Sequence, residues 1–577
     1  MLFWGLPWVL RLLPLVTANS YSGAQKTVAP SLSSWKALNS SVGGRLRTGV
    51  PLARPCFELA DTAGATNQSE CAAIRQGWSN SLFLVENFGA YMNTQWGSCQ
   101  ATSQSCLIHG INSSDPAPSD PPNICRQGSV PPYYIDVRDA SDVQKALAFS
   151  KNTGIPLVVK NTGHDYLGRS SAPGALALWT HNLKAISYHA AFVPSGCPVS
   201  RAKPGVTMGA GVIINDAVAF AEQHNITLVL GAETSVGPSG GWVMGGGHGA
   251  LANTQGLGAD RVLEFKLVTP TGQLLVANEC QHTDLFWALR GGGGGTFGVV
   301  LESTALAAPR LTLQVAFAAF SRNNTNATRG LYEVVAENSV SWAQQGFGGY
   351  IEPYQALYVT PTLNSTATAV TMKPLFDYVA SLAPKDPGVQ FFSVELPSYG
   401  AFHEAFLAGS GATVGENAAI ASRLIPTANF ANASSRATLV DALMETLAHV
   451  TFDLTLIATT PFNVPDDGTT SVTPAWRNSI WHAVAEGGWD GAAPRAQEKV
   501  AYSGISAAAD FLRAITPGGG AYQNEADVHE PNHETSFWGP NYPRLLQIKK
   551  KYDPDNILTC WHCVGYNPAD PRFACYI

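Results

Sequence analysis

Charged side chains are scarce in this sequence of 577 residues, where Asp, Glu, Lys and Arg together make up only 13%. That is about half of the roughly 25% typical of soluble domains. The 35 Lys and Arg residues are outnumbered by 42 Asp and Glu residues, so the net charge is −7. Nucleic acids and anionic lipids attract basic surfaces, so the composition argues against both partners. Hydrophobic residues reach 45%, which argues against an intrinsically disordered chain.

Long apolar runs are absent after the N-terminus, where no stretch approaches the roughly 18 apolar residues that cross a bilayer. Residues 1–18 are apolar, and Val16 and Ala18 fit the small-residue rule of a cleavage site. We therefore predict a secretory signal peptide. Pro7 and Pro14 argue against a membrane-spanning helix, and a buried N-terminal helix is the alternative.

Sequons and cysteines agree with export. Ten cysteines in an exported chain predict disulfides, although their pairing does not follow from the sequence. Five of them precede residue 126, which predicts a cystine-rich lead-in over residues 19–125. Eight Asn-x-Ser/Thr sequons predict a glycosylated surface. These sequons begin at Asn39, Asn67, Asn112, Asn225, Asn323, Asn326, Asn364 and Asn432.

Hydrophobic periodicity divides the remaining chain into three parts. Residues 126–310 alternate strand-like and helix-like patterns, including a helix that is predicted to end at Gly154, and predict an α+β domain. Residues 311–515 contain longer strand-like runs between helical stretches, and predict a second α+β domain that shapes the substrate site. Residues 516–577 begin with a glycine run and continue into a helix-like segment.

Three short patterns imitate well-known motifs without the context that gives those motifs their chemistry. His529–His533 reads H-E-x-x-H, but Pro531 prevents the continuous helix that would place both imidazoles on one zinc ion. Gly237–Gly241 reads G-x-S-x-G inside a long glycine loop, not at a strand-to-helix turn. Gly293–Gly298 reads G-x-G-x-x-G but follows a helix and precedes a strand. We therefore predict no metal site, no serine hydrolase and no NAD site.

Glycine clusters are the main functional signal. They comprise Gly163 with Gly168, Gly240–Gly249, and Gly291–Gly298. Glycine allows the backbone to approach a ligand closely and to direct its N–H groups at phosphate oxygens. Several such loops in one domain suit a ligand with a pyrophosphate, although any single loop could equally be a tight turn.

These loops resemble those of a known family. Lys160–Gly168 looks like the pyrophosphate loop of the vanillyl-alcohol-oxidase and p-cresol-methylhydroxylase-type FAD-linked oxidases, and Gly240–Asp260 and Asp284–Gly293 look like two further signatures. The segment from Ala521 to Pro554 resembles the C-terminus of berberine-bridge-enzyme-like members. The sequence is most similar to secreted fungal members of the isoamyl-alcohol-oxidase-like kind.

The resemblance implies a two-domain α+β flavoprotein. Residues 126–310 would form an FAD-binding domain of two subdomains, and 311–515 a substrate domain with an antiparallel sheet covered by helices. Residues 516–577 would return to the FAD domain. In the family a loop histidine forms an 8α-histidyl bond to FAD, and His164 occupies that place. The implied cofactor-binding residues are Asn161, Thr162, Gly163, His164, Asp165, Gly168, Val236, Gly237, Gly241, Gly245, Gly246, His248, Gly249 and Asn524.

The sequence departs from the family pattern at two places. Many berberine-bridge-like members have a second covalent link through a cysteine, and Glu233 stands at that position. We therefore expect a single covalent link to FAD, through His164. The family signature Tyr-x-Asn-Tyr reads Tyr522-Gln523-Asn524-Glu525 here, so its second tyrosine is a glutamate.

The predicted function is that of a secreted FAD oxidase. It would remove hydride from an alcohol or a secondary-metabolite intermediate, with or without oxidative ring closure, and reduce O2 to H2O2. The expected partners are thus a small-molecule substrate and O2, and the oligomeric state does not follow from the sequence. The alternatives are a dehydrogenase with another electron acceptor and a secreted binding glycoprotein without redox chemistry.

The predicted catalytic residues are Tyr522 and Glu525. Strand alternation would place Tyr522 and Asn524 on one face and Glu525 on the other, so that Tyr522 and Glu525 would not both face the flavin. A phenol with its ordinary pKa near 10 is a poor base, so the Tyr522 ring could instead pack under the flavin. An acid or a histidine from 311–515 is a further candidate for the base.

Overall fold

The computed structural model describes residues 30–57, 67–110, 112–115, 119, 123–322, 324–409, 414–491 and 493–577. The predicted signal peptide (1–18) and the predicted glycosylation site Asn323 lie outside these residues. Among the residues described, no helix combines the length and the apolar character that a bilayer crossing requires.

A four-stranded sheet supports the first glycine loop. Its order is β1 (Leu46–Thr48), β2 (Tyr133–Asp136), β4 (Leu176–Trp179) and β3 (Leu157–Lys160). Strands β2, β4 and β3 are parallel, whereas β1 is antiparallel to β2. Helix α4 (Ala140–Thr153) precedes β3; Asp139 caps its N-terminus, and Gly154 ends it at a φ of +72°, as predicted. Because β1 lies in the cystine-rich lead-in, that segment is built into the sheet.

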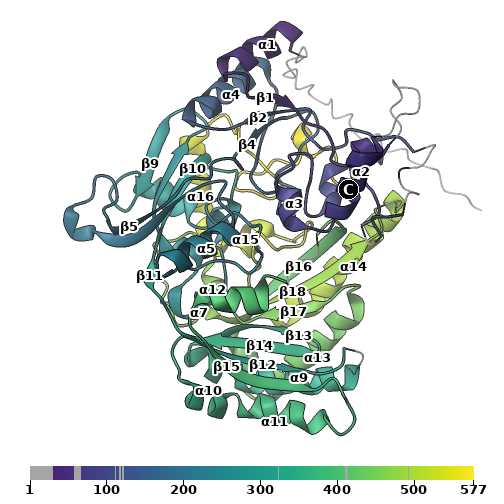
Figure 1. Cartoon of the computed structure of the whole chain (residues 1–577), viewed down its shortest axis with the longest axis vertical. Coiled ribbons are helices and arrows are strands. Elements are labelled where there is room, and N and C mark those ends of the chain that lie inside the picture. Colours follow the sequence, from purple (N-terminus) through teal and green to yellow (C-terminus); the bar gives the residue numbers. More distant parts are fainter. Residues whose placement is uncertain are drawn as a thin grey trace, which may run out of the picture.

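A five-stranded antiparallel sheet forms the other half of the upper part of the molecule (Figure 1). Its order is β5 (Ile186–Phe192), β6 (Lys203–Gly209), β10 (Val299–Leu306), β8 (Val262–Val268) and β9 (Leu274–Asn278). Strands β8 and β9 form a hairpin. A small sheet pairs β7 (Ile226–Thr227) with β11 (Ala308–Pro309). The short helices of this half are α5 (Ile214–Gln223), α6 (Gly241–Gly245), α7 (Ala252–Gln255) and α8 (Thr283–Leu289).

A seven-stranded antiparallel sheet dominates the lower half of the molecule (Figure 1). Its order is β15 (Gln390–Leu396), β12 (Leu313–Ala319), β14 (Gln355–Thr360), β13 (Gly348–Glu352), β17 (Leu454–Ile457), β18 (Ser479–Trp489) and β16 (Asn417–Pro426). Its helices are α9 (Thr325–Gln344), α10 (Ser365–Thr371), α11 (Lys373–Leu382), α12 (Tyr399–Phe402), α13 (Ala433–His449) and α14 (Arg495–Ile515).

Alternation along these strands separates a helix-covered face from a cavity face. On β14, Ala356 and Tyr358 belong to the core cluster that also contains residues of α9, α11 and α13, whereas Leu357 borders a cavity. On β18, Ala485 faces the same core and Glu486 faces the cavity. Successive side chains of a strand point to opposite faces, so the sheet packs on its helices with one face and presents the other to a ligand space.

The C-terminal segment returns to the upper half. Helices α15 (His533–Trp538) and α16 (Tyr542–Tyr552) pack in one hydrophobic cluster with α8. The Trp538 indole donates to the Gly291 carbonyl oxygen over 3.0 Å. The C-terminus, marked near α2 (Gln68–Gly77) in Figure 1, contacts the lead-in, where the Ala101 N–H donates to the Cys575 carbonyl oxygen over 3.2 Å. The lead-in also contributes α1 (Leu32–Ser41) and α3 (Ser81–Val85).

All ten cysteines are in disulfides, as predicted. Four pairs join residues within the lead-in, within the five-stranded subdomain or within the tail, and one joins the lead-in to the C-terminus over a sequence separation of 476 residues. The pairs are Cys56–Cys71, Cys99–Cys575, Cys106–Cys125, Cys197–Cys280 and Cys560–Cys563.

Candidate active site

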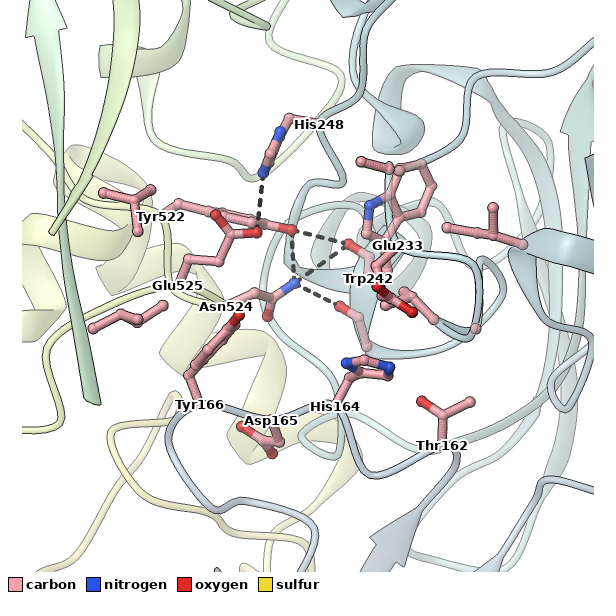
Figure 2. A pocket seen from close by; sticks show the side chains of 18 of the residues that line it. Thr162, His164, Asp165, Tyr166, Glu233, Trp242, His248, Tyr522, Asn524 and Glu525 are labelled. Atoms are coloured by element: carbon pink, nitrogen blue, oxygen red, sulfur yellow. Dashed lines mark hydrogen bonds and ion pairs between the residues drawn. The ribbon is translucent and has the colours of Figure 1, made fainter. Parts of the chain in front are cut away.

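A cavity of about 920 Å³ lies between the glycine loops and the open face of the seven-stranded sheet. Its volume falls at the upper end of the range for small-molecule and cofactor sites, roughly 300–1,000 Å³. Figure 2 shows that the labelled side chains from three distant segments of the chain converge there. The segments are the loop after β3, the loop that contains α6, and the turn at 522–525.

The first loop begins at a buried lysine. The Lys160 ammonium donates to the carbonyl oxygens of Phe88 and Ala90, each over 2.6 Å, and burial lowers its pKa to about 7. The next residue, Asn161, donates to the Ala210 carbonyl oxygen over 2.6 Å. A Cβ atom at Gly237 would stand 2.4 Å from Asn161 Nδ2, so a larger residue there would displace the Asn161 amide from its hydrogen bond.

His164 lies on the cavity wall with its ring uncharged. Its Nε2 atom is 2.6 Å from Ser235 Oγ, and the Ser235 hydroxyl donates to the Glu233 carboxylate over 3.0 Å. Burial lowers the pKa of His164 to about 4, although the charge of Glu233 opposes that shift. A neutral imidazole retains a lone pair on one ring nitrogen, and this neutral form acts as a nucleophile.

The second glycine loop packs against the turn at 522–525. Helix α6 ends at Gly245, where a Cβ atom would lie 2.3 Å from Asn524 Nδ2, so a larger residue would push the Asn524 side chain away. Asn524 donates to the Gly241 carbonyl oxygen over 3.0 Å and to the Tyr522 hydroxyl oxygen over 2.8 Å. These bonds attach the C-terminal segment to the loop.

The predicted strand at 522–525 is wrong. The Glu525 N–H donates to the Tyr522 carbonyl oxygen over 2.9 Å, which makes this segment a turn. Strand alternation therefore does not apply, and Tyr522, Asn524 and Glu525 all border the cavity (Figure 2). The Tyr522 hydroxyl also accepts the Gly247 N–H over 3.2 Å, and burial followed by the charge of Glu525 raises the pKa of Tyr522.

Glu525 lies between two histidines. His248 Nε2 is 3.0 Å from one carboxylate oxygen and His482 Nε2 is 2.8 Å from the other. Burial acts to raise the pKa of Glu525, but the charges and hydrogen bonds of the two imidazoles outweigh it and hold that pKa well below its ordinary value. His248 Nδ1 lies 2.9 Å from Thr459 Oγ1. The carboxylate is thus ionised and held in one orientation.

Sequence reasoning did not single out His482, which comes from β18 and is fully buried behind Glu525. Burial lowers the pKa of His482, against the effect of Glu525. The sequence analysis also did not single out Glu486, which is four residues after His482 on β18 and on the same face of the strand. Burial, with the charges of Asp453, Glu416 and Glu525, raises the pKa of Glu486 to about 7. The strand pattern of 479–489 was the signal available, since alternate residues share a face.

Most of the predicted cofactor-binding residues meet at this cavity. The residues that line it are Asn161, Thr162, Gly163, His164, Asp165, Val236, Gly237, Gly241, His248 and Asn524. Gly168, Gly245, Gly246 and Gly249 pack behind its wall instead.

Two of the three short motif-like patterns lack the local structure that the corresponding motifs require. Asn532 has a φ of +51° and precedes α15, so His529 and His533 are not on one helix. Ser239 is buried and bonds to the Met208 carbonyl oxygen and the Ser303 hydroxyl. Neither pattern supports the chemistry that its letters suggest.

The residues of the cavity wall fit FAD. Asn161 Oδ1 and Ser170 Oγ border the cavity and are buried without a hydrogen-bond partner among the described residues. Buried polar atoms are normally hydrogen-bonded, so these two point to a ligand. The glycine loops add backbone N–H groups near the same wall, which suit a pyrophosphate.

Comparison with known proteins agrees with this geometry. Residues 131–278 match a family described as FAD binding domain, and residues 521–562 match berberine and berberine like. The chain is 38% identical to the FAD-linked oxidoreductase cheF of Chaetomium globosum, over 98% of this chain and 91% of that protein. It is 32% identical to the bifunctional decalin synthase calF of Penicillium decumbens, over 93% and 91%.

A solved structure shows the same fold. The VAO-type flavoprotein MtVAO615 of Myceliophthora thermophila is 29% identical, with a TM-score of 0.81 over 93% of this chain and 95% of that one. This likeness confirms the predicted two-domain α+β flavoprotein fold.

Proposed function

This chain belongs to the FAD-linked oxidoreductases with the vanillyl-alcohol-oxidase-type fold and a berberine-like C-terminus, and we propose that it is an exported oxidase. It would oxidise an alcohol or a secondary-metabolite intermediate and pass the electrons to O2. The observation that carries the proposal is that a neutral His164 and an ionised Glu525 border the same cavity beside the glycine loops.

FAD would be held by the wall that the glycine loops form. Thr162, Gly163 and Asp165 would surround it from the first loop, and Gly237 and Gly241 from the second. The cofactor would supply the acceptor for the substrate's hydride and would return the electrons to O2. Because every cysteine of the chain is in a disulfide, no thiol is free to form a second link, which supports a single covalent attachment through His164.

Glu525 is the better candidate for the base. The Tyr522 hydroxyl already accepts hydrogen bonds from Gly247 and Asn524, and its raised pKa disfavours the phenolate. The Glu525 carboxylate is ionised and borders the cavity, so it can accept the proton of a substrate hydroxyl. As hydride leaves the carbon, that hydroxyl becomes strongly acidic, and a weak base then suffices.

The sheet face would bind the rest of the substrate. Tyr350, Leu357 and Phe317 provide apolar surface, and Glu486 provides a carboxyl group. This mixture suits an intermediate with an apolar body and hydroxyl groups. The name of calF, a bifunctional decalin synthase, supports ring closure as a variant of the reaction.

Export is supported by the five disulfides and by the exposure of the sequons. Asn39 is half-buried, and the other described acceptor residues are exposed on the surface; they are Asn67, Asn112, Asn225, Asn326, Asn364 and Asn432. We therefore propose that these asparagines are glycosylated.

Three measurements test the proposal. The purified holoenzyme should release H2O2 with at least one member of a panel of alcohols and secondary metabolites, while the substrate bleaches the flavin under anaerobic conditions. Bleaching without H2O2 formation in air would indicate a dehydrogenase instead. Flavin should remain attached to wild-type protein after acid denaturation, and His164→Ala should release it.

A further inference from the structure

A chain of hydrogen bonds runs from the lead-in to His164. We name Ser81, Glu233 and Ser235 the serine–glutamate relay. Ser81 Oγ, at the start of α3, donates to Glu233 Oε1 over 2.9 Å, and Ser235 Oγ donates to the same oxygen over 3.0 Å. His164 Nε2 lies 2.6 Å from Ser235 Oγ. The relay therefore ends on the ring proposed to hold FAD.

The direction of these bonds determines where the ring carries its proton. Burial acts to raise the pKa of Glu233, but the hydrogen bonds from Ser81 and Ser235 lower it. The ionised carboxylate is an acceptor only, so Ser235 uses its single hydroxyl hydrogen to bond to Glu233. Its oxygen can then only accept from His164, which places the ring proton on Nε2.

The other ring nitrogen is consequently the reactive one. His164 Nδ1 makes no hydrogen bond with any described residue, and the side chain borders the cavity. A deprotonated ring nitrogen that faces a ligand space retains its lone pair. In the opposite tautomer, Nδ1 would carry the proton. The lone pair would then be on Nε2, where Ser235 occupies it.

We propose that the serine–glutamate relay holds the ring proton of His164 on Nε2 and removes that proton as Nδ1 bonds to FAD. The proposal rests on the covalent attachment proposed above. Glu233 and Ser235 are positioning residues, since they act through His164. The lead-in contributes Ser81 to the same function, although Ser81 precedes His164 by more than 80 residues in the sequence.

The bond-forming step balances with O2 as the oxidant. One C–H bond of the flavin 8α-methyl group breaks, and its proton leaves to solvent or to a base. A C–N bond forms between that carbon and Nδ1, and the Nε2 proton leaves through Ser235 toward Glu233. The two electrons remain on the flavin until O2 accepts them with two protons to give H2O2.

The test measures flavin attachment rather than turnover. Apoprotein produced in a riboflavin-limited host is mixed with FAD, and covalent flavin is followed by the fluorescence of denatured protein on gels. We expect Ser235→Ala and Glu233→Gln to bind FAD but to attach it at least about tenfold more slowly. Ser81→Ala should slow attachment less, and Ser235→Thr, which keeps the hydroxyl, should restore it.

Ser239→Ala is the matched control, because Ser239 is equally buried in the same loop and its hydroxyl bonds to Met208 and Ser303 instead. It should attach FAD at the wild-type rate. Mass spectrometry and NMR of the flavin peptide should place the linkage on Nδ1 of His164. Thermal melts identify any variant that fails to fold, and Ser235→Ala decides the matter if Glu233→Gln does not fold.

The outcomes separate the two proposals. Wild-type protein without covalent flavin would overturn the attachment itself. Covalent flavin in wild type, with unchanged rates in Ser235→Ala and Glu233→Gln or with a linkage at Nε2, would overturn the relay alone.

Discussion

Glu525 and His482 are 43 residues apart in the sequence, yet their side chains meet at 2.8 Å. Glu525 lies in a turn of the C-terminal segment and borders the cavity, whereas His482 lies on β18 and is buried behind it. The contact therefore joins the C-terminal segment, which packs against the second glycine loop, to the seven-stranded sheet. It also explains why this partly buried carboxylate stays ionised.

Replacement of the proposed base should separate it from its neighbour. Glu525→Gln keeps the shape of the side chain but cannot accept a proton, so flavin reduction should slow by roughly 10²–10⁴-fold. Tyr522→Phe should slow it by less than about tenfold, because the tyrosine hydroxyl serves as a hydrogen-bond acceptor for Gly247 and Asn524. Anaerobic stopped-flow reduction by a true substrate measures both. A larger loss in Tyr522→Phe would return the base to the tyrosine.

Removal of the buried imidazole should shift the pH dependence. In His482→Phe, Glu525 loses one of the two partners that lower its pKa, so that pKa should rise. The base acts only when ionised, and activity should then be lost at a higher pH on the acid side than in wild type. His482→Gln retains an N–H donor, so it should move the acid limb of the pH profile less than His482→Phe does. The measurement is the rate of flavin reduction against pH, and an unchanged acid limb would contradict this role.

Glu486 should make stability depend on pH. Its pKa is about 7 in the folded protein against 4.5 for the free side chain, so the folded state holds a proton that the unfolded state releases. The resulting loss of stability is absent below pH 4.5, grows between about 4.5 and 7, and has an upper bound of roughly 3 kcal/mol. Glu486→Gln should therefore raise the melting temperature relative to wild type more at pH 8 than at pH 4.5. Glu445→Gln, on the exposed side of α13, is the control and should show no such trend.

The disulfide between Cys99 and Cys575 should support the flavin loop as well as the fold. Tyr576, next to Cys575, donates its hydroxyl to the Leu167 carbonyl oxygen over 2.6 Å. Replacement of both cysteines by serine should cost roughly 2–5 kcal/mol of stability and lower FAD occupancy. Melting curves and the flavin-to-protein absorbance ratio measure the two effects.

The disulfide between Cys197 and Cys280 provides the comparison, because its sequence separation is 83 residues rather than 476 and it lies in the five-stranded subdomain. Its removal should lower stability less and leave FAD occupancy unchanged. Equal loss of flavin in both double variants would show that the Cys99–Cys575 disulfide has no particular effect on the loop that contains Leu167.

Several local features of this protein follow from the order of its residues alone. Gly154 ends a helix because that position requires a left-handed backbone conformation. The loop around His164 is recognisable because its consecutive residues match a known family motif. The class of fold and the presence of disulfides also followed from patterns along the chain.

The contacts between distant side chains depend on how the separate segments pack in three dimensions. The turn at 522–525 replaces the expected strand, since its ends are held by loop contacts to Gly241 and Gly247 that no local pattern shows. His482 and Ser81 reach Glu525 and Glu233 through packing of separate segments. Hydrogen bonds and charge effects act over a few ångströms in space, and periodicity along the chain carries no information on those distances.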